Sequence, residues 1–272
     1  MSGNGHRLLT GGRLEGALAF LGGLYSNHLA LRAVLADARA RGAEGIFCLG
    51  DLGGFGPSPG KIYPLLEEFE VVTLAGNYDR SLAERLPDCG CGYTHPSDNH
   101  FARLSYDYTS RRTTDREREW LARLPSAIRF RRGGLRYLLC HGSPRRTNEF
   151  LWESATADVF LERMAREAEA DQVLCTHTGI RWQRALPGGA RFINVGAVGR
   201  PENDGRPEVG YALLPPGEHA AQMIRVAYDH ESMASEMEGE ALPAEFVETI
   251  RTGWWTTCLE ILPAKERGRS KF

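Results

Sequence analysis

Four side chains that could share one metal ion lie far apart in this chain of 272 residues, each just after a short apolar run. The four residues are Asp51, Asn77, His141 and His177, and the runs are 45–49, 71–74, 135–139 and 172–174. A carboxylate, an amide oxygen and two imidazoles suit manganese, iron, zinc or nickel better than magnesium, calcium or copper(I). The pattern therefore predicts a site for one divalent or trivalent transition metal ion, formed by these four side chains.

The elements that must position these side chains alternate between strands and helices in the first part of the chain. The expected strands are 17–21, 45–49 and 71–74, and the expected helices are 27–41, with an Asn27 N-cap, and 62–69. Helical crossovers join parallel strands, and the carboxyl ends of parallel strands meet at one edge of a sheet. The pattern therefore predicts an α/β core that presents the four ligands at that edge.

The rest of the chain divides into a helical segment and a region of closely spaced strands. Residues 79–124 carry no strand signal and are predicted to form a helical insert. Further strands are expected at 128–132, 135–139, 191–195, 209–214 and 223–227, and a helix is expected at 155–168. The first two of these strands flank a Gly-Gly hairpin turn. The last three lie too close for helical connections, so we expect a second, antiparallel-rich sheet packed on the first.

Composition limits the classes of partner. Net charge is −2, from 33 basic and 35 acidic residues, which creates no overall field for nucleic acid. No apolar run approaches the ~20 residues that span a bilayer, and the first residues lack the apolar stretch of a signal peptide. We expect a cytoplasmic protein with a flexible arm at 1–16, one domain at 17–229, and a helical extension at 230–272 packed on that domain.

Five motifs, in order, resemble those of the calcineurin-like metallophosphoesterases, and more narrowly the small bacterial branch of phosphodiesterases and diadenosine-tetraphosphatase-like enzymes. The motifs are Gly50–Pro57, Gly76–Asp79, His141–Arg145, Thr176–Gly179 and Asn194–Pro201. The match runs from about Ala17 to about Asp229. The resemblance implies a two-sheet α/β/β/α sandwich, a metal-dependent reaction and a small phosphorylated substrate.

The chain departs from the family at three positions. Gly23 and Gly179 stand where the family has metal-ligating Asp and His, and Tyr25 stands where it has another His. By the family pattern all three losses fall on one metal of a two-metal site, while Asp51, which bridges the two, is kept. Three interpretations stay open: Tyr25 or His28 holds a surrogate second metal, or the Tyr25 ring fills the space.

Other residues near the ligands could bind a phosphate or assist the reaction. Tyr78 stands where the family has a His that assists the leaving group, but a phenol with a pKa near 10 is a poor acid–base catalyst at neutrality. Guanidinium groups match phosphate and could replace a lost cation. The candidates are Arg80, Arg145, Arg146, Arg181 and Arg200, with Arg145 and Arg146 favoured.

Three hypotheses for function follow. One is a mononuclear metal-dependent hydrolase of small or nucleotide-type phosphoric mono- or diesters, slowed by the loss of one metal. Another is an impaired homologue that binds a metal or a phosphorylated ligand without turnover. A scaffold that uses the Trp254-Trp255 pair is disfavoured because all four ligands are retained. The C-terminal extension could also mediate a homo-oligomer, and its Trp pair is expected to be core or dimer contact. Cys89 and Cys91 lack a second pair at zinc-site spacing, and their role is left open.

Overall fold

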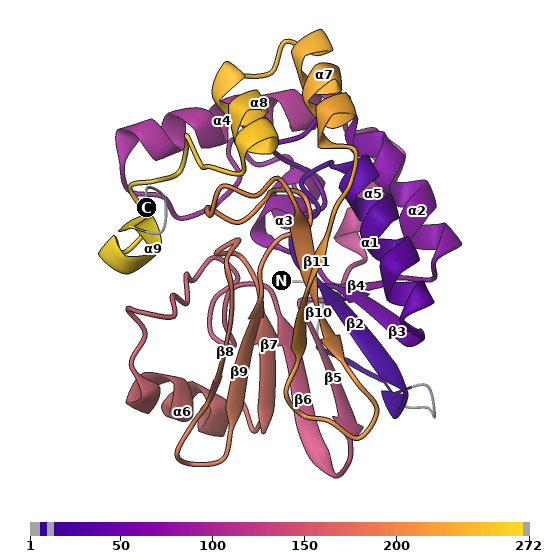
Figure 1. Ribbon diagram of the computed structural model, residues 1–272, viewed down its shortest axis with the longest axis vertical. Coiled ribbons are helices and arrows are strands. Elements are labelled where there is room, and N and C mark those ends of the chain that lie inside the picture. The colour runs from indigo at the N-terminus through magenta and orange to yellow at the C-terminus, as the bar shows by residue number, and fades with distance from the viewer. Residues whose placement is uncertain (1–5, 10–13, 269–272) are drawn as a thin grey trace.

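The computed structural model describes residues 6–9 and 14–268 and contains two packed β-sheets (Figure 1). The five-stranded sheet has the order β11-β10-β2-β3-β4. Its strands are β2 (Ala17–Leu21), β3 (Ala43–Cys48), β4 (Val72–Thr73), β10 (Val209–Leu214) and β11 (Gln222–Val226). β2, β3 and β4 are parallel, whereas β10 runs antiparallel to both β2 and β11.

The six-stranded sheet has the order β1-β5-β6-β7-β9-β8. Its strands are β1 (His6–Leu8), β5 (Ala127–Arg132), β6 (Leu135–Cys140), β7 (Gln172–Cys175), β8 (Arg181–Ala185) and β9 (Arg191–Val195). β6, β7 and β9 are parallel, and β5 and β8 are antiparallel to β6 and β9 respectively. Each sheet therefore contains a parallel part that carries two of the predicted ligands at its carboxyl end.

Helices cover the outer faces of both sheets and one end of the sandwich. They are α1 (His28–Ala40), α2 (Ile62–Glu68), α3 (Asn77–Ala83), α4 (Pro96–Arg112), α5 (Asp115–Ala122), α6 (Asp158–Glu167), α7 (His230–Gly239), α8 (Ala244–Thr252) and α9 (Ala264–Gly268), with a 3-10 turn at Pro59–Lys61. Figure 1 shows α1 and α2 beside β2 and β3, α6 beside β8 and β9, and α4, α7 and α8 gathered at one end. No helix in the described ranges is long and apolar enough to cross a membrane.

The two sheets pack through aromatic rings on their inner faces. Phe20 stacks on Phe47 with ring centroids 5.3 Å apart, and Phe47 stacks on Phe130 at 5.8 Å. On the opposite face of β2, Leu21 packs in the cluster that contains Leu31 of α1. Side chains alternate between the two faces of a strand, so each sheet buries one face against the other sheet and one against helices.

The predicted two-sheet α/β/β/α sandwich is confirmed, with corrections to its strands. Residues 191–195, 209–214 and 223–227 do not form one sheet. β9 extends the six-stranded sheet beside β7, whereas β10 and β11 return to β2. Sequence reasoning also missed β8 at 181–185, which pairs antiparallel with β9.

The prediction of a flexible arm at 1–16 also needs correction, because part of this segment forms a strand. His6–Leu8 form β1 and pair with β5, while residues 1–5 and 10–13 lie outside the described residues. The start of α1 was predicted correctly, because capping is local. The Asn27 side chain accepts a hydrogen bond of 3.0 Å from the Ala30 amide at the start of α1.

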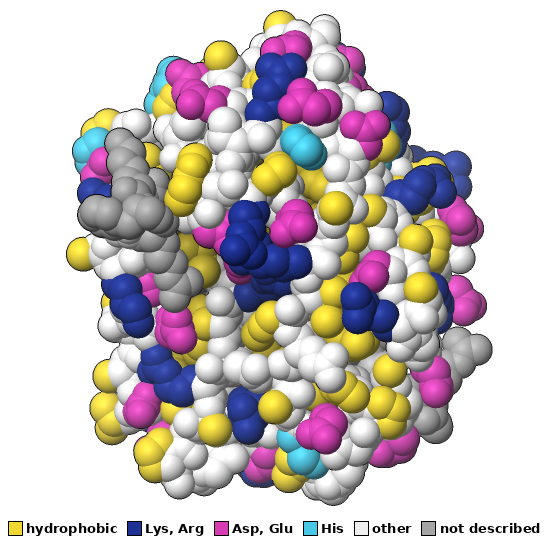
Figure 2. Space-filling model, viewed as in Figure 1, with side chains coloured by type: hydrophobic (Ala, Val, Ile, Leu, Met, Phe, Trp, Pro, Cys, Tyr) yellow, Lys and Arg dark blue, Asp and Glu magenta, His cyan; other side chains and the backbone are white. Residues whose placement is uncertain are grey.

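Charged side chains of both signs are interspersed on the face shown in Figure 2, with one group of Lys and Arg side chains near its centre bordered by Asp and Glu. This distribution matches the net charge of −2.

Candidate metal centre

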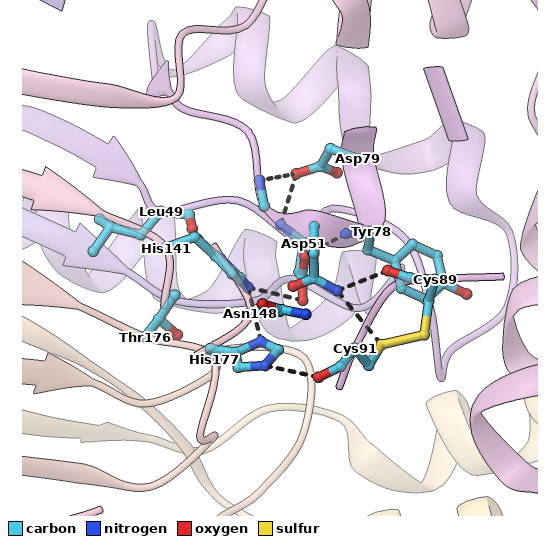
Figure 3. Close-up of polar contacts among 12 residues, drawn as sticks. Leu49, Asp51, Tyr78, Asp79, Cys89, Cys91, His141, Asn148, Thr176 and His177 are labelled. Carbon is cyan, nitrogen blue, oxygen red and sulfur yellow. Dashed lines mark hydrogen bonds and ion pairs between the residues drawn. A yellow bond between two sulfur atoms is a disulfide. The ribbon is translucent and has the colours of Figure 1, made fainter. Parts of the chain in front are cut away.

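The four predicted ligands lie at the carboxyl ends of four strands from the two sheets. Asp51 follows β3, Asn77 is the first residue of α3 after β4, His141 follows β6 and His177 follows β7. One ligand atom each from Asp51, His141 and His177 lies within 4.8 Å of the others, and all three side chains are buried. Figure 3 shows these three side chains pointing toward one another. The fold therefore brings together residues that are up to 126 positions apart, from 51 to 177.

Tight backbone turns make this approach possible. Asp51 and His177 adopt left-handed conformations, with φ of 57° and 71°, at a cost of roughly 1 kcal/mol each. A Cβ atom on Gly76 would lie 2.1 Å from Oδ1 of Asp51. Glycine at 76 therefore lets the first turn of α3 reach Asp51, and the Tyr78 amide donates to the same Oδ1 over 3.1 Å.

Hydrogen bonds determine which nitrogen of each histidine faces the centre. His141 Nδ1 lies 2.6 Å from the Leu49 carbonyl oxygen, and His177 Nε2 lies 3.2 Å from the Cys91 carbonyl oxygen. A carbonyl only accepts, so each of these nitrogens carries a hydrogen. The lone pairs of neutral His141 Nε2 and neutral His177 Nδ1 therefore face the centre, and a backbone carbonyl orients each imidazole as in metal sites.

These lone pairs converge on a carboxylate. His141 Nε2 lies 3.1 Å from Asp51 Oδ2 and 3.1 Å from His177 Nδ1. Acceptor atoms this close need a proton or a cation between them. Burial disfavours charge on all three groups, but the Asp51 carboxylate holds the pKa of His141 above 6.5, and His141 holds the pKa of Asp51 below its ordinary value. Burial and His141 together lower the pKa of His177 to about 3.

Asn77 offers the amide oxygen of the ligand set. Its Nδ2 atom donates 2.9 Å to the Cys89 carbonyl oxygen and lies 3.5 Å from Cys91 Sγ. Its Oδ1 atom is buried and has no hydrogen-bond partner among the described residues. A buried, unsatisfied oxygen costs roughly 1–3 kcal/mol, which a bound cation would offset. The donor set and this orphaned atom together fit a transition metal ion.

The Asp79 carboxylate holds the two loops that carry Asp51 and Asn77. Both carboxylate oxygens of buried Asp79 accept backbone hydrogen bonds, from the amides of Asp51 at 2.7 Å, Leu52 at 3.0 Å and Gly76 at 2.8 Å. These bonds tie the β3 turn to the start of α3.

Cys89 and Cys91 form a disulfide, which sequence reasoning did not assign. The carbonyl oxygens of both residues accept hydrogen bonds from ligands, Cys89 from Asn77 and Cys91 from His177. The Asn148 side chain donates 2.9 Å to the carbonyl of Gly90 between them. The Cys-x-Cys spacing was the available signal, but its proximity to the ligands depends on tertiary contacts.

Aromatic rings fill the space beside Gly23 and Gly179, two of the three positions at which the sequence departs from the family pattern. A Cβ atom on Gly23 would lie 2.4 Å from Cε1 of Tyr25, and a Cβ atom on Gly179 would lie 3.1 Å from Cη2 of Trp255. Burial, with a smaller effect of Asp51, raises the pKa of Tyr25, so its phenol stays protonated. The geometry supports the interpretation in which the Tyr25 ring fills the space. His28 Nε2 instead lies 3.5 Å from Glu236 Oε2.

A cavity of about 80 Å³ opens beside the centre. Asp51 and His177 form part of its wall. The aromatic residues lining it are Tyr25, Phe55, Tyr78, Tyr93, Phe101 and Phe246. Tyr78 directs its hydroxyl to Ser105 and Thr109, each at 3.2 Å, and burial raises its pKa.

Of the predicted phosphate-binding arginines, Arg200 lines this cavity and the other four do not. Arg145 pairs with Glu149, and Arg181 pairs with Glu202. Arg146 is exposed and Arg80 is half-buried, and both lie outside the cavity wall.

A sequence model described as the calcineurin-like phosphoesterase superfamily domain matches residues 21–216. The chain therefore belongs to the calcineurin-like phosphoesterase superfamily, whose general reaction is metal-dependent hydrolysis of phosphoric esters.

The chain is also similar to individual proteins along most of its length. The chain is 24% identical to an uncharacterised protein of Methanocaldococcus jannaschii, over 88% of this chain and 99% of that protein. It shares the fold of a metallophosphoesterase from Sphaerobacter thermophilus, with a TM-score of 0.67 and 24% identity, and of a hypothetical protein from Pyrococcus horikoshii OT3, with a TM-score of 0.74 and 20% identity. In both structures the match covers 88% of this chain and 99% of the other.

Proposed function

We propose that this protein is a metal-dependent phosphoric ester hydrolase that works with one metal ion. Its substrate is a small or nucleotide-type phosphomonoester or phosphodiester. The observation that carries the proposal is the convergence of His141 Nε2 on Asp51 Oδ2 and His177 Nδ1, both at 3.1 Å. We assign the Oδ1 atom of Asn77 as the fourth ligand, because it is buried and has no partner among the described residues.

The metal would be manganese, iron, zinc or nickel, because the ligands are two oxygens and two imidazole nitrogens. A bound metal ion would polarise a phosphoryl oxygen and lower the pKa of water toward neutrality. Asp51, Asn77, His141 and His177 would hold the ion, and a set of four protein ligands would leave it accessible to substrate and water.

The chain's own residues set the limits of the reaction. One ion cannot clamp the attacking and leaving oxygens together, and the loss of one charge stabiliser costs on the order of 10²–10³ in rate. The Tyr78 hydroxyl is bonded to Ser105 and Thr109, and its pKa is raised, so it is a poor acid for the leaving group. We therefore expect slow hydrolysis that favours esters with good leaving groups, such as nitrophenyl esters.

The test combines metal content with turnover. Protein purified without chelator should hold about one equivalent of transition metal and hydrolyse nitrophenyl phosphate or bis-nitrophenyl phosphate. Asp51→Asn and His177→Ala should lose both metal and activity. His100→Ala is the matched control, because His100 is exposed on α4. Two equivalents of metal, or activity that survives in Asp51→Asn, would contradict the proposal.

A second candidate function is metal or phosphate binding without turnover. It is favoured by the Tyr25 and Trp255 rings, which lie where Gly23 and Gly179 side chains would extend. In that case the metal and inorganic phosphate bind, while every phosphate ester remains intact over long incubations with each candidate metal.

We also propose a cytoplasmic location, which cell fractionation would test. The homo-oligomer predicted from the C-terminal extension would be tested by light scattering.

A further inference from the structure

Arg200 carries a buried guanidinium group that lies close to two aromatic rings. Its Cζ atom lies 3.8 Å from the ring centroid of Trp255 and 5.0 Å from that of Phe55. The residue is 7% exposed. Nη2 donates 2.8 Å to the Thr257 carbonyl oxygen and lies 3.5 Å from its Oγ1, whereas Nε is buried without a partner in the described structure.

This cation has no counter-ion in the part of the chain that the structure describes. No carboxylate of the described residues lies within ion-pair distance of Arg200, whereas Arg181 and Arg225 both pair with Glu202. A buried charge without a counter-ion is costly, and stacking on aromatic rings compensates for only about 1–2 kcal/mol. An anion that entered the cavity and bound the guanidinium would reduce the free-energy cost of burying this charge.

The position of Arg200 beside the candidate metal centre indicates which kind of anion it would bind. Arg200 lines the same cavity as Asp51 and His177, beside Tyr25. The glycine turn that ends at Arg200 packs tightly on this tyrosine, since a Cβ atom on Gly199 would lie 2.5 Å from the Tyr25 Cβ. Arg200 therefore lies on the side of the site where the Tyr25 and Trp255 rings fill the space beside Gly23 and Gly179.

We propose that Arg200 binds the phosphoryl group of the substrate and supplies the positive charge that the missing second metal would otherwise supply. This inference rests on the function proposed above. Guanidinium donates hydrogen bonds to phosphate oxygens and keeps its charge at all relevant pH values. Arg200 is then a catalytic residue, and Trp255 and Thr257 are positioning residues that the C-terminal extension contributes to the site.

The test measures phosphate binding separately from turnover. Inorganic phosphate is titrated into metal-loaded and chelator-treated protein, and its dissociation constant is followed by calorimetry or phosphorus NMR. Arg200→Met should weaken phosphate binding at least tenfold in both forms, and Arg200→Lys should restore part of the loss. Trp255→Leu should weaken binding less than Arg200→Met, and Trp255→Phe should stay close to wild type because it keeps a ring under the guanidinium. Arg103→Met is the control, since Arg103 is exposed on α4.

The outcomes separate this inference from the proposed function. Unchanged phosphate affinity in Arg200→Met, with about one metal equivalent retained, overturns the role of Arg200 and leaves the hydrolase proposal intact. Absence of metal from wild type would contradict the hydrolase proposal, while the chelator-treated series would still test Arg200. If Arg200→Met does not fold, wild-type phosphate affinity in both Arg200→Lys and Trp255→Leu overturns the inference.

Discussion

The side-chain nitrogen of Asn77 lies 2.9 Å from the carbonyl oxygen of Cys89, to which it donates. This hydrogen bond sets the orientation of the amide, because it commits the nitrogen and leaves Oδ1 for a cation. The neighbouring Cys91 carbonyl accepts from His177 in the same way. One short disulfide-closed turn thus orients two of the four proposed ligands.

Replacing both cysteines of this turn should weaken metal binding. In Cys89→Ser/Cys91→Ser the two carbonyls lose their covalent constraint, and we expect metal affinity to fall about 10–100-fold, the range for lost supporting contacts. Competition with a metal-binding dye would measure it. Cys258→Ser is the control, because Cys258 is a free cysteine in the wall of the same cavity and its replacement breaks no disulfide. Equal affinity in the double variant and wild type would contradict a role for the turn.

Metal affinity should depend on pH through one proton. In the metal-free protein Asp51 holds the pKa of His141 above 6.5, and a metal must displace that proton. Affinity should therefore fall up to tenfold per pH unit as pH decreases below the raised pKa, and level off above it. His177 contributes no second proton because its pKa is about 3. Dissociation constants measured from about pH 5.5 to about pH 8.5 check this, and a slope of two protons would refute it.

Glu202 should stabilise the fold in a pH-dependent way. Its carboxylate lies 2.9 Å from Arg181 Nε and 3.2 Å from Arg225 Nη2, and these pairs hold its pKa below the ordinary value despite burial. A lowered pKa adds stability above the unfolded-state pKa, and that stability is lost as pH falls through the folded-state value. Glu202→Gln should cost about 2 kcal/mol near pH 7, less than for a fully buried pair because Arg225 is partly exposed.

Urea unfolding near pH 7 and near pH 3 would measure this difference. The gap between Glu202→Gln and wild type should shrink at acid pH. Glu218→Gln, at an exposed position, should match wild type at both pH values. A gap that stays constant with pH would indicate that packing, and not charge, accounts for the loss.

Gly179 and Trp255 should be energetically coupled. A Cβ atom at 179 would lie 3.1–3.2 Å from the Trp255 ring, and the backbone there has φ of 74°. Gly179→Ala should therefore destabilise the protein by about 1–2 kcal/mol through backbone strain and crowding. In a Trp255→Leu background the crowding disappears and about 1 kcal/mol of strain remains. Thermal or urea unfolding of the four proteins completes the cycle, and identical costs in both backgrounds would show that the ring does not limit residue 179.

Local patterns determined much of this protein from its sequence alone. The strands Ala17–Leu21 and Val209–Leu214 and the capped start of α1 follow from runs and caps of a few residues. The four proposed ligands and their positions after strands were also predicted from the sequence. These features depend on neighbours within one turn or one strand, so a single stretch of chain contains the information.

Tertiary structure decided what depends on partners distant in the chain. It placed β9 beside β7 and β10 beside β2, although their spacing suggested one sheet. It also brought Trp255 against Arg200, and favoured Arg200 over the arginines nearer to His141. Strand pairing and side-chain contacts depend on which distant segments bury the most surface together. A local stretch of sequence does not contain that information.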